Sequence, residues 1–255
     1  MRNRKLALMV VLAGMVALVP AAPGASDVSR RANDGAVGAG GGLVAAAVVS
    51  QNLPIATWTL PAQAYDGIGS WMVLGNVPTA GAGQVAPAYA MVHEFDFINH
   101  PEADALVMLG IDGGARFAEF IVYWNDGRIL EATMPFEWQP YRWYFPFVYK
   151  AAEGIWAAFV YDLTAATSTY IGSHVVPAEW GAIDRETYLY VDWFGDPPAT
   201  CAGYPHADVY RMAPTGYVGQ VASQSSLTTT TNITGTCPGT VASYPDANWS
   251  HFLMG

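Results

Sequence analysis

Two kinds of residue are scarce in this 255-residue sequence. Cysteine occurs twice, and Lys and Arg together number 11 against 21 Asp and Glu. Six of the 11 basic residues and 20 of the 21 acidic residues lie beyond position 31, which gives that part a formal balance of −14. Such a surface repels phosphate backbones, so we exclude nucleic acid as a partner and expect a neutral or cationic ligand or a bound cation.

The familiar motifs of catalysis and cofactor binding are also absent. The sequence has no Gly-x-Ser-x-Gly, no His-Glu-x-x-His, no phosphate-binding loop and no dinucleotide-binding fingerprint. Its five histidines are scattered without the spacing of metal ligands, so we predict no metal site. No cofactor is expected, and calcium is the one ion that the acidic composition leaves open.

The N-terminus has the pattern of an export signal. Arg2, Arg4 and Lys5 precede an uncharged apolar run over residues 6–22. Small residues follow, where a signal peptidase would cut, so we predict a signal peptide over residues 1–25 and a secreted protein. The alternative is an uncleaved membrane anchor, although the run is near the lower limit of about 17 residues for a spanning helix.

The rest of the chain is expected to form one domain after a short leader. Residues 26–50 are rich in Gly and Ala without periodicity, which predicts a flexible leader. The mature N-terminus is expected between Ala21 and Ala32, and residues 51–255 are long enough for one well-filled domain. No other stretch is apolar for long enough to span a membrane, so the mature chain should have no span.

The two cysteines, Cys201 and Cys237, are far apart in the sequence and close to its end. In an exported chain an isolated pair is most simply a disulfide. The segment between them is mostly Ser, Thr, Gly and Asn, which could not order itself by burial. Closing this loop would stabilise the fold by about 4 kcal/mol through loss of unfolded-state entropy.

Past position 50 the sequence is typical of β-strands joined by turns. Residues in these segments alternate or form β-branched and aromatic runs, and no segment between them has helical periodicity. We therefore predict an all-β protein with antiparallel sheets packed as a two-sheet sandwich or closed as a barrel. A sandwich would place Phe95, Phe97, Val191 and Trp193 in the shared core. Short helical turns are expected at 101–105 and 178–183. The predicted strands are 92–98, 117–124, 128–134, 143–149, 155–161, 169–176, 187–194 and 209–212.

Glu94 and Asp96 stand out because two carboxylates two residues apart lie on one face of a strand. The segment resembles the Glu-x-Asp-x-x-Glu strand of laminarinase-type glycoside hydrolases, which are jelly-roll sandwiches with the concanavalin-like fold. That resemblance implies Glu94 as nucleophile and Asp96 as the assisting carboxylate. Asn99 departs from the pattern, because it stands where the acid/base glutamate would fall and cannot donate a proton usefully. The alternative is a strand whose Phe residues are buried and whose acids face water.

The next acidic residues, Glu102 and Asp104, follow Pro101 and fall outside the alternation of this strand. A longer stretch of the chain is similar to a group of secreted, mostly bacterial sandwich proteins of unknown function. This similarity supports the fold and export and implies no activity. It is carried by Trp138-Gln139-Pro140, Trp156, Asp162, Ile171-Gly172, Val176-Pro177, Trp180-Gly181, Trp193-Phe194-Gly195 and Cys201.

Aromatic residues give the last indication of function. The sequence has nine Trp and 14 Tyr, and several of them alternate with acids along predicted strands. If these rows lie beside Glu94 and Asp96, they would line an acidic and aromatic groove suited to a glycan. The alternative is that the rings fill the core. The candidate ligand-binding residues are Glu119, Tyr123, Tyr188, Tyr190 and Asp192.

We therefore expect a secreted protein that binds carbohydrate or cell-wall polysaccharide without cleaving it, because the candidate active strand lacks its proton donor at Asn99. The alternative is a glycoside hydrolase or polysaccharide lyase that uses the same groove. A carboxylate facing Glu94 from another strand, such as Glu119 or Asp192, would favour this alternative.

Overall fold

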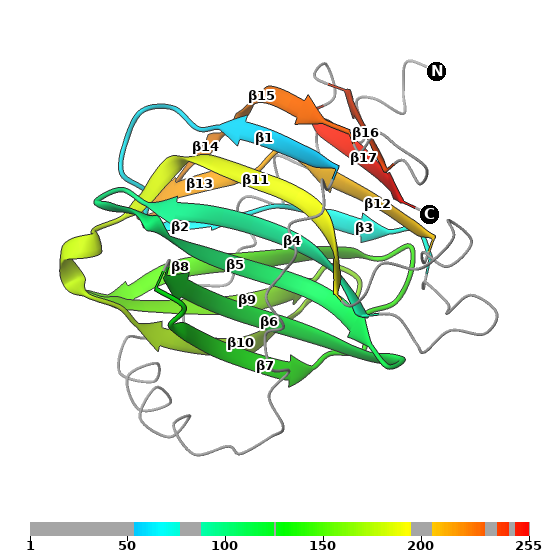
Figure 1. The fold of residues 1–255 in the computed structure, drawn as a ribbon, viewed down its shortest axis with the longest axis horizontal. Coiled ribbons are helices and arrows are strands. Elements are labelled where there is room, and N and C mark those ends of the chain that lie inside the picture. Colours follow the sequence, from blue (N-terminus) through cyan, green and yellow to red (C-terminus); the bar gives the residue numbers. More distant parts are fainter. Residues whose placement is uncertain are drawn as a thin grey trace.

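The computed structural model describes residues 54–76, 88–124, 126–194, 206–232, 239–244 and 248–254. These residues form two antiparallel sheets packed face to face as a sandwich, as the sequence predicted (Figure 1). The predicted signal peptide, leader and disulfide pair Cys201 and Cys237 lie outside the described residues and stay predictions. Within the described residues, no helix is long and apolar enough to cross a membrane.

The first sheet has seven strands in the order β15-β1-β11-β4-β5-β6-β7. Its centre is a meander of consecutive hairpins, because β4, β5, β6 and β7 each pair with the next strand along the chain. The strands are β1 (Ile55–Thr59), β4 (Ala88–Phe97), β5 (His100–Asp112), β6 (Ala115–Trp124), β7 (Ile129–Pro135), β11 (Ile183–Phe194) and β15 (Ser226–Thr231).

The second sheet has ten strands and is built around β8. One edge of β8 pairs with both β2 and β3, and the other edge pairs with β9, which in turn pairs with β10. From β2 the sheet extends to β13 and β14, and from β3 it extends to β12, β17 and β16. The strands are β2 (Gly67–Gly69), β3 (Met72–Leu74), β8 (Trp143–Ala152), β9 (Ile155–Asp162), β10 (Thr167–Val175), β12 (Ala207–Met212), β13 (Thr215–Val218), β14 (Val221–Gln224), β16 (Thr240–Tyr244) and β17 (Trp249–Met254).

The core between the sheets follows the two-residue alternation of the strands. Phe95, Phe97 and Val191 are fully buried in it, as predicted. Trp156 of β9 and Phe252 of β17 meet them from the ten-stranded sheet. The side chain of Trp193, which was also predicted for the core, lies outside the described part of the structure. Because these residues face inward, their neighbours along each strand must face outward.

Strand β5 corrects the sequence analysis. The expected helical turn at 101–105 is wrong: these residues belong to an extended strand that pairs with β4 on one side and β6 on the other. The turn into β6 uses Gly113 and Gly114, whose φ angles of 55° and 90° suit glycine. The second expected turn, at 178–183, is a short 3-10 helix, η2 (Ala178–Trp180).

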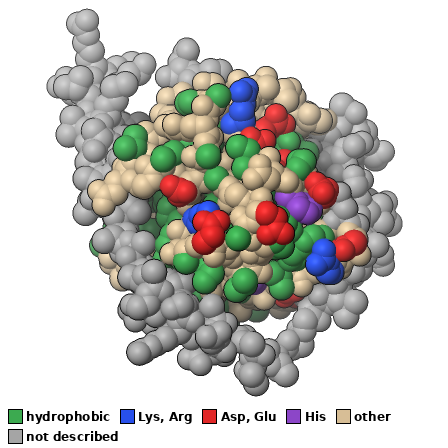
Figure 2. Space-filling model, turned by 90° about the vertical axis from the view of Figure 1, so that its left-hand side faces the viewer, with side chains coloured by type: hydrophobic (Ala, Val, Ile, Leu, Met, Phe, Trp, Pro, Cys, Tyr) green, Lys and Arg blue, Asp and Glu red, His purple; other side chains and the backbone are tan. Residues whose placement is uncertain are grey.

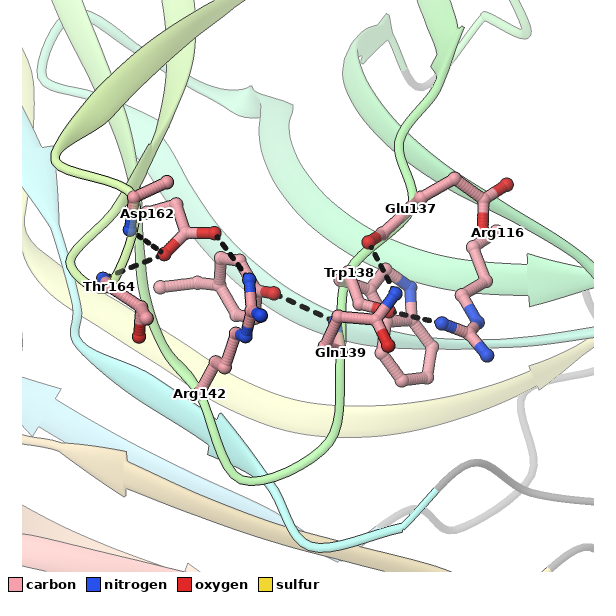
Figure 3. Close-up of polar contacts among 9 residues, drawn as sticks. Arg116, Glu137, Trp138, Gln139, Arg142, Asp162 and Thr164 are labelled. Carbon is pink, nitrogen blue, oxygen red and sulfur yellow. Dashed lines mark hydrogen bonds and ion pairs between the residues drawn. The ribbon is translucent and has the colours of Figure 1, made fainter.

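The loop from β7 to β8 carries the chain from one sheet to the other. Trp138 in this loop is fully buried, and its indole N–H donates to the Gly110 carbonyl at 2.9 Å. Arg116 of β6 donates to the Trp138 carbonyl, and Arg142 lies 3.7 Å from a carboxylate oxygen of Asp162 (Figure 3). The loop is therefore tied to β5 and β6 on one side and to β9 on the other.

Candidate functional site

The outer face of the seven-stranded sheet brings together most of the residues that the sequence analysis singled out. We call this surface the acidic face and define it by Glu94, Asp96, Asp104, Glu119, Tyr123, Tyr188 and Tyr190. Each of these residues alternates along its strand with residues of the main core. A second apolar cluster lies on the same side, with Val92, Leu106, Met108 and Tyr190 among its buried members.

Strand register fixes which of these side chains are neighbours. Glu94 of β4 lies opposite Tyr188 of β11, and Asp96 lies opposite Asp104 of β5. Asp104 in turn lies opposite Tyr123 of β6. Residues directly opposite in an antiparallel pair have Cβ atoms about 4.5–5.5 Å apart, so these side chains interact. Glu94 and Asp96 are therefore joined by a third carboxyl group from the next strand.

Asp96 and Asp104 form the pair with the most unusual protonation. Partial burial, a hydrogen bond with Asp104, and the negative charges of Asp104, Glu94 and Asp184 raise the pKa of Asp96 to about 8. Two carboxyl groups this close cannot both ionise easily, so one proton is held between them. The acidic face thus keeps a proton donor at neutral and acid pH.

Tyrosine hydroxyls surround the carboxyl groups. The Tyr190 hydroxyl donates to Glu94, and the Tyr188 hydroxyl donates to Glu186 Oε1 at 2.6 Å. Tyr123 bonds to Asp104, and its pKa is raised by burial and by the charges of Glu94 and Asp104. These phenols therefore stay protonated and act as hydrogen-bond donors that orient the carboxyl groups.

Glu119 lies one strand farther from Glu94, on β6. It is only 5% exposed, lies opposite Met108 and Thr133, and accepts a hydrogen bond from the Thr133 hydroxyl. Burial raises the pKa of Glu119 to about 7; the Thr133 hydrogen bond offsets part of this effect, and Glu131 adds to it. Glu119 is therefore a second carboxyl group that holds its proton in acid.

The structure places the predicted site residues as follows. It brings Glu94, Asp96, Glu119, Tyr123, Tyr188 and Tyr190 onto one face, whereas only the backbone of Asp192 is described, opposite Ala90. Asn99 lies in the turn after β4 and donates from its side chain to the Glu179 carbonyl at 3.0 Å. It therefore ties this turn to η2.

The sequence analysis missed Asp104. It excluded this residue because Asp104 follows Pro101 and breaks the alternation of β4, but the chain reverses at residues 98–99 and returns as β5. Asp96 and Asp104 lie on either side of the hairpin turn between β4 and β5. Their pairing could have been predicted from this spacing if 100–112 had been assigned as a strand.

Charge on the molecular surface is uneven. Figure 2 looks at the end of the sandwich where η2 and the turn between β4 and β5 lie, and acidic side chains there outnumber basic ones. No group of three or more His, Cys, Asp or Glu residues with the geometry of a metal site occurs in the described part of the chain.

No protein-family model and no curated protein sequence matches this chain. Solved structures do match its fold. One is scytalido-glutamic peptidase with a peptide-based transition-state analogue, with a TM-score of 0.51, 12% identity and coverage of 80% of this chain and 98% of that chain. A second structure, of scytalido-glutamic peptidase with a transition-state analogue inhibitor, gives a TM-score of 0.51, 12% identity and coverage of 81% and 99%. A third is SCP-B of the eqolisin family of peptidases with the tripeptide Ala-Ile-His. It gives a TM-score of 0.50 and 11% identity, with coverage of 81% of this chain and 99% of that chain.

These comparisons contradict the predicted function and partner. The three matching structures named above are of peptidases, so the expectation of a glycan-binding protein is wrong, as is the alternative of a glycoside hydrolase. The error has a physical cause. Carboxylates accept hydrogen bonds from amides as readily as from sugar hydroxyls, and tyrosine rings pack against many kinds of ligand, so this pattern of residues does not by itself indicate a glycan.

Proposed function

We propose that this chain is a secreted peptidase that hydrolyses peptide bonds at the acidic face in acid conditions. The observation that carries the proposal is the proton held between Asp96 and Asp104 beside Glu94, on a sandwich whose fold is shared with glutamic peptidases. Peptide hydrolysis needs one group that takes a proton from water and another that returns a proton to the leaving amine. Neighbouring carboxyl groups in different protonation states supply both.

In this proposal Glu94 is the general base. The Tyr190 hydroxyl holds its carboxylate, and Glu94 lies two residues from Asp96 on the same face of β4. Glu94 takes a proton from a water molecule, and the water oxygen attacks the carbon of the scissile carbonyl. The C–N bond then breaks as Asp96 donates its proton to the amine nitrogen. The proton on Glu94 returns to the Asp96–Asp104 pair through solvent, which restores the resting state.

The remaining residues of the acidic face would bind the substrate. Tyr188 and Tyr123 are partly exposed on either side of the carboxyl groups and offer rings against which peptide side chains can pack. Protonated Glu119 lies on β6 at the level of Val92 and Met108, where it can donate a hydrogen bond to a peptide carbonyl. Export through the predicted signal peptide is part of the proposal, since it would place the enzyme outside the cell.

The test is hydrolysis of an unfolded protein by the purified chain, followed by mass spectrometry of the products between pH 3 and 7. We expect cleavage that is strongest in acid and that falls by at least 100-fold in Glu94→Gln and in Asp96→Asn, because each variant removes one proton-transfer group. Glu137→Gln is the matched control, since this exposed glutamate lies in the loop after β7, away from the acidic face.

Two results would refute the proposal. The first is the absence of any cleavage by folded wild-type protein over the whole pH range. The second is cleavage that persists unchanged in Glu94→Gln and Asp96→Asn, which would place the chemistry elsewhere on the molecule.

A further inference from the structure

A cationic side chain lies inside the sandwich without a negative partner among the described residues. Arg211 of β12 is 1% exposed, and its Nη1 donates to the Val92 carbonyl of β4 at 2.9 Å. Its Nε and Nη2 atoms are also buried and have no hydrogen-bond partner in the part of the chain that the structure describes. None of the ion pairs among the described residues includes Arg211. A buried charge of this kind is costly unless something neutralises it.

Neither Ser250 nor His93 supplies that charge. Ser250 of β17 lies directly opposite Arg211, is fully buried, and its hydroxyl has no partner. His93 of β4 is also fully buried, and burial together with the positive charge of Arg211 lowers its pKa well below the ordinary value. His93 is therefore neutral. Burial also lowers the pKa of Arg211, to about 9, so the guanidinium keeps its charge at neutral and acid pH.

The hydrogen bonds of His93 define its orientation. The Thr187 hydroxyl donates to the Glu94 carbonyl at 2.7 Å, so it accepts from His93 Nε2 at 2.8 Å. His93 Nδ1 is then an acceptor, and it too is buried without a partner. This region of the core therefore has three groups that can donate a hydrogen bond and have no partner among the described residues: Arg211 Nε, Arg211 Nη2 and Ser250 Oγ. It also has one such acceptor, His93 Nδ1, which a water molecule would satisfy.

We propose that Arg211 and Ser250 bind a chloride ion between the two sheets. A monovalent anion balances the single charge of the guanidinium, and it accepts hydrogen bonds from Nε, Nη2 and the Ser250 hydroxyl. The occupant must be small, because both side chains are almost completely enclosed by the core. Since Arg211 also holds the carbonyl of Val92, the ion would fix β12 and β17 against β4 from behind the acidic face. The proposal stands independently of the peptidase activity.

The direct test is diffraction from crystals of the whole protein grown in sodium bromide, with data collected at the bromine edge. We expect an anomalous peak within hydrogen-bonding distance of Arg211 Nε or Nη2 and of Ser250 Oγ. An ordered water at this position with no anomalous signal would overturn the proposal, and so would a guanidinium paired with a protein carboxylate.

The same site should be visible in solution. At constant ionic strength, replacing gluconate by chloride should raise the Tm of the wild type by roughly 5–11 °C at a hundredfold excess over Kd. Arg211→Met should lose this shift, whereas Arg128→Met, which removes an exposed arginine, should keep it. Ser250→Ala should reduce it while leaving the fold intact, so the test survives if Arg211→Met does not fold. Equal Tm values in chloride and gluconate for the wild type would refute the site.

Discussion

The outer faces of the two sheets are built from similar strands but carry different chemistry. The acidic face places carboxyl groups opposite one another, with tyrosine hydroxyls as donors. The outer face of the ten-stranded sheet carries a row of rings instead, which we call the aromatic face. Phe145, Phe147 and Tyr149 of β8 stack with centroids 5.8 Å apart, and the row continues through Phe159 and Tyr170 on β9 and β10.

This difference shows that aromatic content alone does not locate the site. Stacked rings of this kind stabilise the fold by burial and dispersion. The acidic face, in contrast, partly buries carboxyl groups and places like charges beside one another, and both effects raise the pKa values of Asp96 and Glu119. Perturbed groups of this kind are typical of functional sites.

The largest expected effect is on stability: a substitution on the aromatic face should lower the free energy of unfolding without changing peptide hydrolysis. Phe147 contacts Phe145, Tyr149 and Tyr217, so Phe147→Ala should lower the free energy of unfolding by roughly 2–3 kcal/mol. Peptide hydrolysis by the folded fraction should be unchanged. Urea unfolding and the hydrolysis assay measure the two quantities. Val175→Ala, which removes part of a 65% exposed side chain, is the control and should change stability by less than about 0.5 kcal/mol.

A loss of hydrolysis by folded Phe147→Ala, with its unfolding free energy unchanged, would reverse the comparison. The aromatic face would then belong to the substrate site, and the acidic face would be a strained but inert surface.

The next effect concerns the acidic face and depends on pH. The pKa of Asp96 is raised from 3.8 to about 8, so the native protein holds a proton that the unfolded chain releases. Stability contributed by this group is therefore present below about pH 4 and is lost as the pH rises towards 8. Asp96→Asn cannot ionise, so it should match the wild type at pH 4 and exceed it by about 1–2 kcal/mol at pH 8, after solvent screening.

Urea unfolding of both proteins at the two pH values gives this difference. His93 and His174 have lowered pKa values and destabilise the native state in acid, but they do so equally in the wild type and the variant. The difference between the two proteins therefore isolates Asp96. If the difference in unfolding free energy between Asp96→Asn and the wild type were the same at pH 4 and pH 8, Asp96 and Asp104 would not hold a proton between them.

Much of the fold followed from local sequence. Alternation placed Phe95 and Phe97 in the core and Glu94 outside, and the predicted strands 117–124 and 128–134 correspond to β6 and β7, which are joined by a turn in which Gly127 has a φ of 86°. Strand β5 was missed because a continuous apolar run, buried on both faces in its middle, has no period-two pattern. Strands β13, β15 and β16 were missed because they are rich in Gly, Ser and Thr and their pairing is set by tertiary contacts.

The sequence predicted which site residues share one face of a strand, but not which residues on different strands contact each other. Same-face spacing assigned Tyr188 with Tyr190 and Glu119 with Tyr123 correctly to common sides of their strands. Which strands would be neighbours could not be inferred from spacing, because 85 residues separate the end of β4 at Phe97 from the start of β11 at Ile183. Consequently the sequence did not predict the contact of Tyr190 with Glu94 or the contact of the Arg211 side chain with the backbone of β4.

The smallest expected effect comes from single hydroxyl groups on the acidic face. Tyr190 is 8% exposed and donates to Glu94, whereas Tyr188 is more exposed and donates to Glu186. Tyr190→Phe should lower stability by about 0.5–1.5 kcal/mol, because the hydrogen bond is lost in a buried setting. It should also lower kcat and move the acid limb of the pH–rate profile upward, since Glu94 loses the donor that stabilises its carboxylate. Tyr188→Phe is the matched control and should leave that limb in place, because its hydroxyl bonds to a glutamate outside the proposed reaction. Equal pH profiles for the two variants would mean that Glu94 is not the general base, even if both variants were active.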